Sequence, residues 1–237
     1  MAAMAGHVVA GVALAVALAA SGHAPDAVGD AHHRPAPTVS RAGHEPAPTV
    51  TPIEKSLVPF AANRGQVDES VRYLAQGSGY HLYLTDAEAM LALRGSGPAE
   101  IGVLRLRPVG AAPARAVSGS DRRHVVTRQV WPGIDWAWHG SSKAPTYDLD
   151  LAPGVDADAA RFEAVGARSL RMDRHGNLLI TNAVGVMTGH APTAWQTARD
   201  GSRQPVLVRY VLLDGNMFGF RIGAHDPTRP VTVDVSM

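Results

Sequence analysis

The 237-residue chain contains no cysteine. This absence excludes a disulfide framework and any thiolate metal site, so the protein has to fold without cross-links. Neither sign of charge is in excess, because 22 Lys and Arg residues stand against 21 Asp and Glu residues and the formal net charge is +1. Such a balance does not favour nucleic acid or an anionic membrane surface as a partner. Hydrophobic residues make up 46% of the chain, which is enough for a real core.

Long apolar runs are missing beyond the first two dozen residues. The run from Val8 to Ala20 reads VVAGVALAVALAA, which has the length of a signal-peptide h-region and is too short to span a bilayer comfortably. We therefore predict a signal peptide over residues 1–22, export to the periplasm, cell surface or extracellular space, and no membrane span after cleavage. An uncleaved anchor or a wrongly assigned start is the alternative.

The next segment, residues 23–55, is rich in Ala, Pro, His and Asp and has no apolar periodicity. This composition is typical of a disordered linker. From residue 56 to residue 237 the pattern changes to short alternating segments separated by Gly, Pro, Asp and Asn. We predict one β domain over residues 56–237.

Three hairpins are predicted in this domain from strand patterns on either side of turn residues. Their turns are expected at 76–79, at 174–177 and at Asp214-Gly215, a dipeptide suited to the positive φ of a type I′ turn. Only Pro153 to Phe162 and Thr85 to Ala89 look capable of a helical turn. Repeated short strands without long helices predict an all-β fold, an antiparallel β-sandwich-like arrangement of layered sheets with at most one or two short helices.

Four segments carry a resemblance to a known family: Phe60 to Arg94, WPGIDWAWHG, YDLDLAPGVD and GAHDPTRPVTVD. Together they resemble the uncharacterised N-terminal domain found ahead of SBBP-type β-propeller repeats in bacterial secreted and cell-surface proteins. The resemblance implies a β-rich module without known catalytic residues. The segment from Ser120 to Val130 is shorter than in that family, so a hairpin is expected to be missing, and the chain reads as a stand-alone, shortened version.

Three of the four tryptophans lie in the stretch VWPGIDWAWHG. Its alternation, together with that of TYDLDL, predicts a hairpin in which Trp138 faces Tyr147 and Trp136 faces Leu149. Aromatic cross-strand pairs on one apolar face are most simply core. The alternative is an open platform on which Trp136 and Trp138 bind a carbohydrate.

The opposite face of this hairpin is polar. In the same register Asp135 lies opposite Asp150, with Asp148 and His139 on the same side. Like charges directly opposed on a sheet are unfavourable, so a nearby Arg, a raised carboxylate pKa, an altered register or a bound cation should compensate. Asp135, Asp148 and Asp150 are therefore candidate Ca²⁺ ligands. A paired-carboxylate hydrolase and an ordinary solvated face are the other interpretations.

These patterns favour an exported bacterial interaction or structural module of the cell envelope or extracellular space over an enzyme. No cofactor is expected apart from the candidate Ca²⁺. An envelope or extracellular protein, or a glycan, is the expected partner. The alternatives are a secreted polysaccharide hydrolase that uses Asp135, Asp148 and Asp150, and a carbohydrate-binding module that uses Trp136 and Trp138.

Overall fold

The computed structural model describes residues 58–237 except 98–99, 113 and 120–121. The predicted signal peptide over residues 1–22 and the predicted linker over residues 23–55 lie outside the described residues. Strands hold 55% of the described residues and helical turns 2%, and all strand pairs are antiparallel, so the all-β prediction is confirmed.

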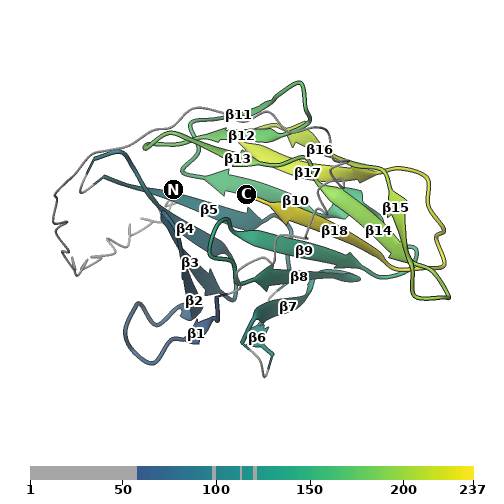
Figure 1. The fold of residues 1–237 in the computed structure, drawn as a ribbon, viewed down its shortest axis with the longest axis horizontal. Coiled ribbons are helices and arrows are strands. Elements are labelled where there is room, and N and C mark those ends of the chain that lie inside the picture. The colour runs from purple at the N-terminus through teal and green to yellow at the C-terminus, as the bar shows by residue number, and fades with distance from the viewer. Residues whose placement is uncertain (1–57, 98–99, 113, 120–121) are drawn as a thin grey trace, which may run out of the picture. The chain divides into compact units, whose positions relative to one another are not determined.

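The strands form three antiparallel sheets (Figure 1). The eight-stranded sheet consists, in spatial order, of β1 (Ala61–Ala62), β2 (Val71–Gly77), β3 (Tyr80–Thr85), β4 (Ala89–Arg94), β5 (Ile101–Pro108), β10 (Arg161–Val165), β17 (Met217–Ile222) and β16 (Val208–Leu213). The seven-stranded sheet consists of β15 (Arg203–Val206), β14 (Thr193–Thr197), β18 (Val231–Ser236), β9 (Thr146–Leu151), β8 (Ile134–His139), β7 (His124–Trp131) and β6 (Ala116–Ser118). The third sheet consists of β11 (Ser169–Met172), β12 (Leu178–Thr181) and β13 (Val186–Gly189).

Alternation along the strands decides which face of the seven-stranded sheet is buried. In β18 the three valines Val231, Val233 and Val235 are buried, while the residues between them are only partly covered. The neighbouring strand β9 follows the same rule, with Tyr147 and Leu149 inside. Successive side chains of a strand point to opposite faces, so this sheet has one apolar and one polar face, as a sandwich requires.

The core between the two large sheets is centred on aromatic side chains. Phe162, on β10 of the eight-stranded sheet, is fully buried. Its ring lies 5.1 Å from the rings of Trp131 and Trp136 and 6.0 Å from that of Tyr147, all on the seven-stranded sheet. Edge-to-face and tilted rings at these distances are favourable. The sandwich-like packing of the two sheets is therefore carried by direct contacts between them.

The predicted hairpins are present, and one turn differs in detail. The β2–β3 and β11–β12 hairpins turn where the sequence predicts. In the β16–β17 hairpin, however, the positive φ values fall on Gly215 and Asn216, at 69° and 59°, and not on Asp214. Asparagine tolerates this left-handed region better than most residues, so the turn is shifted by one residue from the predicted position.

Of the two segments expected to be capable of a helical turn, Pro153 to Phe162 forms one and Thr85 to Ala89 does not. Within Pro153 to Phe162 only the 3₁₀ turn η1 (Ala157–Ala159) is helical, with the side chain of Asp156 as its N-cap. The segment from Ser120 to Val130 holds most of β7, which pairs with β6 before it and with β8 after it. Figure 1 shows these two strands next to β8 at the end of the seven-stranded sheet. Strand β6 is thus an edge strand of this sheet.

Candidate functional site: a groove beside β6

A groove of about 630 Å³ opens on the described part of the structure. One wall is the β3–β4 turn at residues 85–88 together with Arg107 and Pro108 at the end of β5. The other is the alanine-rich connection between β5 and β6, which contributes Ala112 and Arg115. The volume lies within the range of small-molecule sites in proteins. The groove is therefore the candidate site.

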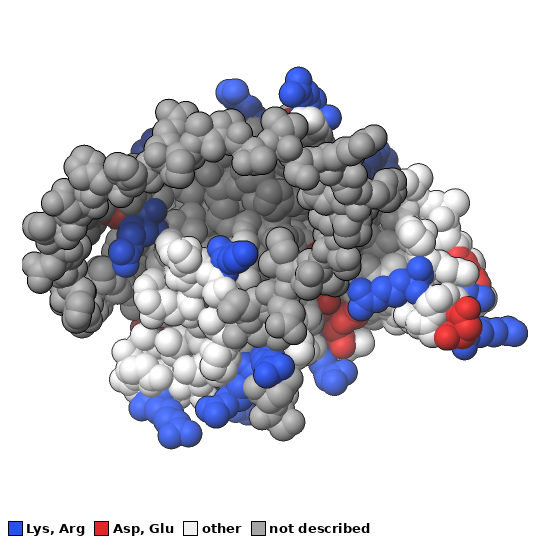
Figure 2. Space-filling model, viewed as in Figure 1, with Lys and Arg blue, Asp and Glu red and all other residues white. Residues whose placement is uncertain are grey.

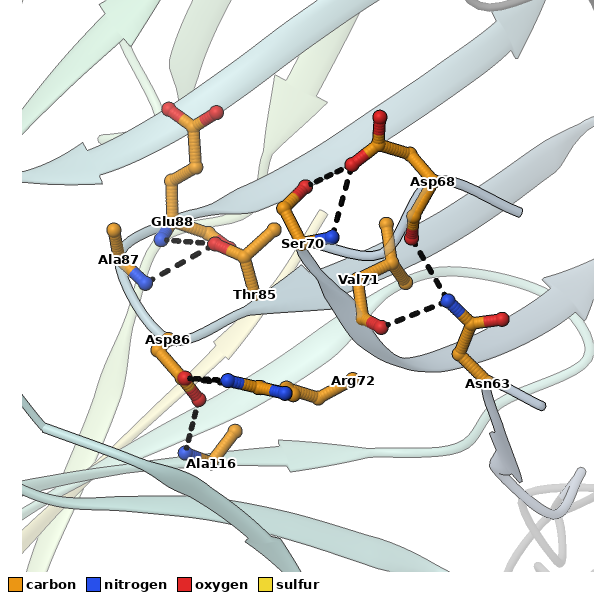
Figure 3. A network of polar contacts seen from close by, with 10 residues as sticks. All are labelled: Asn63, Asp68, Ser70, Val71, Arg72, Thr85, Asp86, Ala87, Glu88 and Ala116. Carbon is orange, nitrogen blue, oxygen red and sulfur yellow. Dashed lines mark hydrogen bonds and ion pairs between the residues drawn. The ribbon is translucent and has the colours of Figure 1, made fainter. Parts of the chain in front are cut away.

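A side-chain hydrogen-bond network shapes the β3–β4 turn (Figure 3). The Oγ1 atom of Thr85 accepts hydrogen bonds from the backbone N–H groups of Ala87 and Glu88, at 3.1 and 2.9 Å. Threonine commonly closes a turn in this way. The turn places the carboxylates of Asp86 and Glu88 at the groove.

Asp86 connects the two sheets. Its Oδ2 atom accepts hydrogen bonds from Nε and Nη2 of Arg72, at 2.9 and 2.7 Å. Its Oδ1 atom accepts one from the backbone N–H of Ala116, on the edge strand β6, at 3.2 Å. Partial burial alone would raise the pKa of Asp86, but the hydrogen bonds from Arg72 and Ala116 and the charges of Arg72 and Arg115 outweigh it and lower the pKa. The carboxylate is therefore held in its ionised form.

Strand β6 has a second contact of the same kind. The backbone N–H of Ser118 donates to the hydroxyl of Tyr73, on β2, at 3.1 Å. Ala116 and Ser118 are two residues apart, so both N–H groups point to the same side of β6, away from β7. An unpaired edge offers such groups to a further strand. Here side chains of the other sheet already occupy them.

Glu88 is neutralised by two arginines. Its carboxylate lies 3.5 Å from Nη1 of Arg105 and 3.3 Å from Nε of Arg107, and its side chain is only 14% exposed. Arg107 also approaches Glu163 on β10, at 3.4 Å. These pairs hold Glu88 and Arg107 in place along the wall of the groove.

The buried end of the groove is formed by Thr127, Val130 and Trp136. A β-bulge interrupts the pairing of β7 with β8 between Thr127 and Trp131, and Gln129 there has a φ of 52°. Its backbone N–H donates to Oδ1 of Asp135 at 2.8 Å. Bulges commonly re-aim side chains next to functional sites, and this one leaves the adjacent residues Val130 and Trp131 both buried.

A smaller hollow of about 390 Å³ adjoins the groove. Arg72 lines the smaller hollow and Asp86 the groove, so their ion pair stands between the two, and Arg115 lines both. The β1–β2 loop beside the smaller hollow is organised by Asn63 (Figure 3), whose amide donates to the carbonyl oxygens of Val67, Asp68 and Val71.

The two tryptophans considered for carbohydrate binding lie in the core. The pairing predicted for the hairpin is confirmed, with Trp136 opposite Leu149 and Trp138 opposite Tyr147. Trp136 is 3% exposed and Trp138 1%. Their rings pack 5.3 Å apart and against Tyr147. Neither indole offers an open face on which a sugar ring could stack; Trp136 reaches the groove only at its buried end.

The three aspartates considered for Ca²⁺ lie on the polar face of the same sheet. Asp135 is opposite Asp150, as predicted. Each carboxylate has its own partner: Asp135 accepts from Gln129, Asp148 lies 2.8 Å from Nε2 of His139, and Asp150 accepts from the hydroxyl of Thr232 at 2.7 Å. In the described part of the chain, no three His, Asp or Glu side chains are arranged to hold a metal ion.

The repulsion between the carboxylates on this face is relieved in part by a raised pKa of Asp150. Burial raises the pKa of Asp150, the charges of Asp148 and Asp135 raise it further, and the hydrogen bond from Thr232 and the charge of His139 oppose the rise. Of the compensations expected from the sequence, a raised carboxylate pKa is therefore present, and Arg128 lies 3.5 Å from Asp135. A calcium site at Asp135, Asp148 and Asp150 gains no support from this arrangement.

Sequence reasoning missed the groove. Asp86 and Ala116 are 30 residues apart, and Arg107 and Glu163 are 56 apart. The only local signal was the expectation of a helical turn at Thr85 to Ala89, where the structure has a non-helical turn between two strands, and it gives no indication of a cavity. On the face shown in Figure 2, basic side chains are scattered and do not form one continuous field. Charge patterning thus offered no guide to the site either.

A family comparison matches residues 108–234, just over half of the chain, to a domain of unknown function (DUF7948). The matched range includes the alanine-rich connection and the buried end of the groove, but not the β3–β4 turn. No curated protein and no solved structure matched the chain. Among the described residues there is also no helix long and apolar enough to cross a membrane.

Proposed function

The chain belongs to the DUF7948 family, and on that premise we propose that it is an exported binding module of the bacterial cell envelope or extracellular space that holds a small ligand in the groove beside β6. The observation that carries the proposal is the groove itself. Its volume of about 630 Å³ and its mixture of apolar walls and a few fixed polar groups are typical of ligand sites.

The chemistry of the groove supports binding over catalysis. Its two carboxylates are already engaged, Asp86 by Arg72 and Glu88 by Arg105 and Arg107. The lowered pKa of Asp86 keeps it ionised near neutral pH, whereas a general acid or base works best with a pKa near the working pH. A rigid, paired rim suits a site that positions a ligand without transforming it.

The binding proposal is tested with a neutral apolar fluorophore, N-phenyl-1-naphthylamine, titrated into the full chain. Saturable enhancement of its fluorescence is expected. Ala112 lines the groove and is exposed, so Ala112→Phe should fill the space and weaken binding strongly. The matched control is Ala183→Phe, at an exposed alanine in the β12–β13 loop, which should bind like the unaltered chain.

A melting curve of each variant establishes that both remain folded. The binding proposal fails if the fluorophore does not bind, or if Ala112→Phe and Ala183→Phe bind it equally.

The export part of the proposal rests on the apolar run from Val8 to Ala20, which has the length of a signal-peptide h-region. We expect the full-length chain, produced in a bacterium, to be recovered outside the cytoplasm with a mass that lacks about residues 1–22. Replacing Leu14 with Arg interrupts the run and should retain the protein in the cytoplasm at full mass. Full-length protein in the cytoplasm without this change would contradict export.

A further inference from the structure

The apolar part of the groove is well defined. Its walls include Ala87, Pro108, Ala111, Ala112 and Ala114, and its buried end includes Val130 and Trp136. Apolar surface removed from water contributes about 25 cal/mol per Å². A ligand with an aliphatic or aromatic body would therefore gain most of its affinity here.

Among the residues that the structure describes, the charges around the groove are paired with one exception. Glu88 and Glu163 are matched by Arg105 and Arg107, and Asp86 is matched by Arg72.

Arg115 is the exception. It is exposed, lines the groove, and has no hydrogen bond or ion pair with the residues that the structure describes. Its charge reaches Asp86 only at longer range. Counted over the described residues, the rim thus has one positive charge in excess, on the side chain of Arg115.

We propose that the ligand is a small apolar acid, with its single carboxylate against the guanidinium of Arg115 and its apolar body against the alanine-rich wall and Trp136. This inference rests on the binding function proposed above. The planar guanidinium matches a carboxylate with two parallel hydrogen bonds. One excess positive charge suits a monoanion, and the same charge repels a cationic ligand.

The apolar body and the charge of the ligand contribute separately to its affinity, so the test varies the charge and keeps the apolar body constant. Three probes share one eight-carbon chain and differ only at the head group: octanoate, octan-1-ol and octylammonium. Each is used to displace N-phenyl-1-naphthylamine from the full chain. A hydrogen bond to a charged group strengthens binding by about 10- to 150-fold, so octanoate should displace the fluorophore at a concentration at least about tenfold lower than octan-1-ol. Octylammonium should be the weakest.

The variant that isolates the charge is Arg115→Gln. It should bring octanoate to the level of octan-1-ol, with the displacement by each probe corrected for the affinity of the variant for the fluorophore, titrated separately. Arg209→Gln is the matched control, because Arg209 is exposed on β16 and does not line the groove. This variant should keep the preference for octanoate.

Equal displacement by the three probes, or a preference for octanoate that survives in Arg115→Gln, overturns the inference. These outcomes differ from failure of the proposed function, in which the neutral fluorophore itself does not bind.

Discussion

At the scale of single residues, one glycine is demanded by a close approach of two strands. Gly166, after β10, has a φ of 93°, and a Cβ atom at this position would lie 2.4 Å from the carbonyl oxygen of Val103 on β5. Both the backbone conformation and the contact exclude a side chain. Gly201 has a similar φ of 83°, but nothing lies within 4 Å of its would-be Cβ.

Comparing these two glycines separates the cost of a positive φ from the cost of the close contact with Val103. Gly201→Ala should lower the free energy of unfolding by about 1–2 kcal/mol, which is the cost of the left-handed conformation for an L-residue. Gly166→Ala should lower it by clearly more, because the Val103 carbonyl is backbone and cannot move aside without disturbing β5. Urea denaturation of both variants measures the difference. Equal losses would show that the close approach is absent.

Asp150 leads to a prediction about pH. Its pKa in the folded state is raised above the ordinary value of 3.8. The folded protein therefore binds a proton at this site more readily than the unfolded chain, and the contribution of Asp150 to stability falls as the pH rises from below 3.8 through its folded pKa. Asp150→Asn removes the charge and still offers Thr232 an acceptor.

We expect Asp150→Asn to be more stable than the unaltered chain at pH 7. The gain should shrink as the pH is lowered toward 3.8, because Asp150 of the unaltered chain is then protonated in the folded protein and is as neutral as the asparagine. Thermal melting at a series of pH values measures this gain in stability. Thr232→Val removes the hydrogen bond that Asp150 accepts, so this variant should be less stable than the unaltered chain at pH 7. A gain that does not depend on pH would contradict the assignment.

At the scale of elements, the edge strand β6 shows how side chains of one sheet cover the edge of the other. It is only three residues long and pairs with β7 alone. Its outward N–H groups at Ala116 and Ser118 are taken by Asp86 and Tyr73, from the other large sheet. Covering an edge in this way prevents pairing with another chain, and here it also builds one wall of the groove.

Tyr73→Phe tests this covering of the edge. The change removes the acceptor for the Ser118 N–H, and a typical hydrogen bond contributes about 0.5–1.5 kcal/mol. Hydrogen exchange at the Ser118 amide should become faster by up to about tenfold, while amides between β9 and β18 in the same sample serve as the internal control. Unchanged exchange at Ser118 would mean that the hydroxyl of Tyr73 does not protect it.

At the scale of the whole molecule, stability depends on the aromatic contacts between the large sheets. Phe162 touches rings from both sheets, including Trp131, Trp136 and Phe218. The fourth tryptophan, Trp195, is different. It lies half-buried on β14, away from this cluster, with the guanidinium of Arg203 4.2 Å from its ring.

Phe162→Ala should therefore lower the free energy of unfolding by about 3–5 kcal/mol, because it leaves a cavity between the sheets. Trp195→Ala should cost about 1 kcal/mol, of which the stacking of Arg203 contributes a part. Denaturant titrations of the two variants test the ranking. Similar losses would contradict a core centred on Phe162.

The sequence by itself determined the features that neighbouring residues specify. Period-2 alternation placed the strands, turn residues placed the hairpins, and the alternation of Trp136 with Asp135 determined the register of β8 and β9, because a one-residue slip would move every side chain to the wrong face. The opposed aspartates on the outer face followed from the same register. The β16–β17 turn lies one residue later than predicted, because Asp214 and Asn216, on either side of Gly215, both tolerate the left-handed conformation.

Only the tertiary structure decided the site. The groove exists because the β3–β4 turn, the end of β5 and the connection to β6 converge, and Asp86 meets Ala116 across 30 residues of chain. Periodicity reports which face of an element is apolar, but it does not report which elements become neighbours. The availability of Arg115 likewise depends on how every nearby carboxylate is paired, and that pairing is a property of the packed sheets.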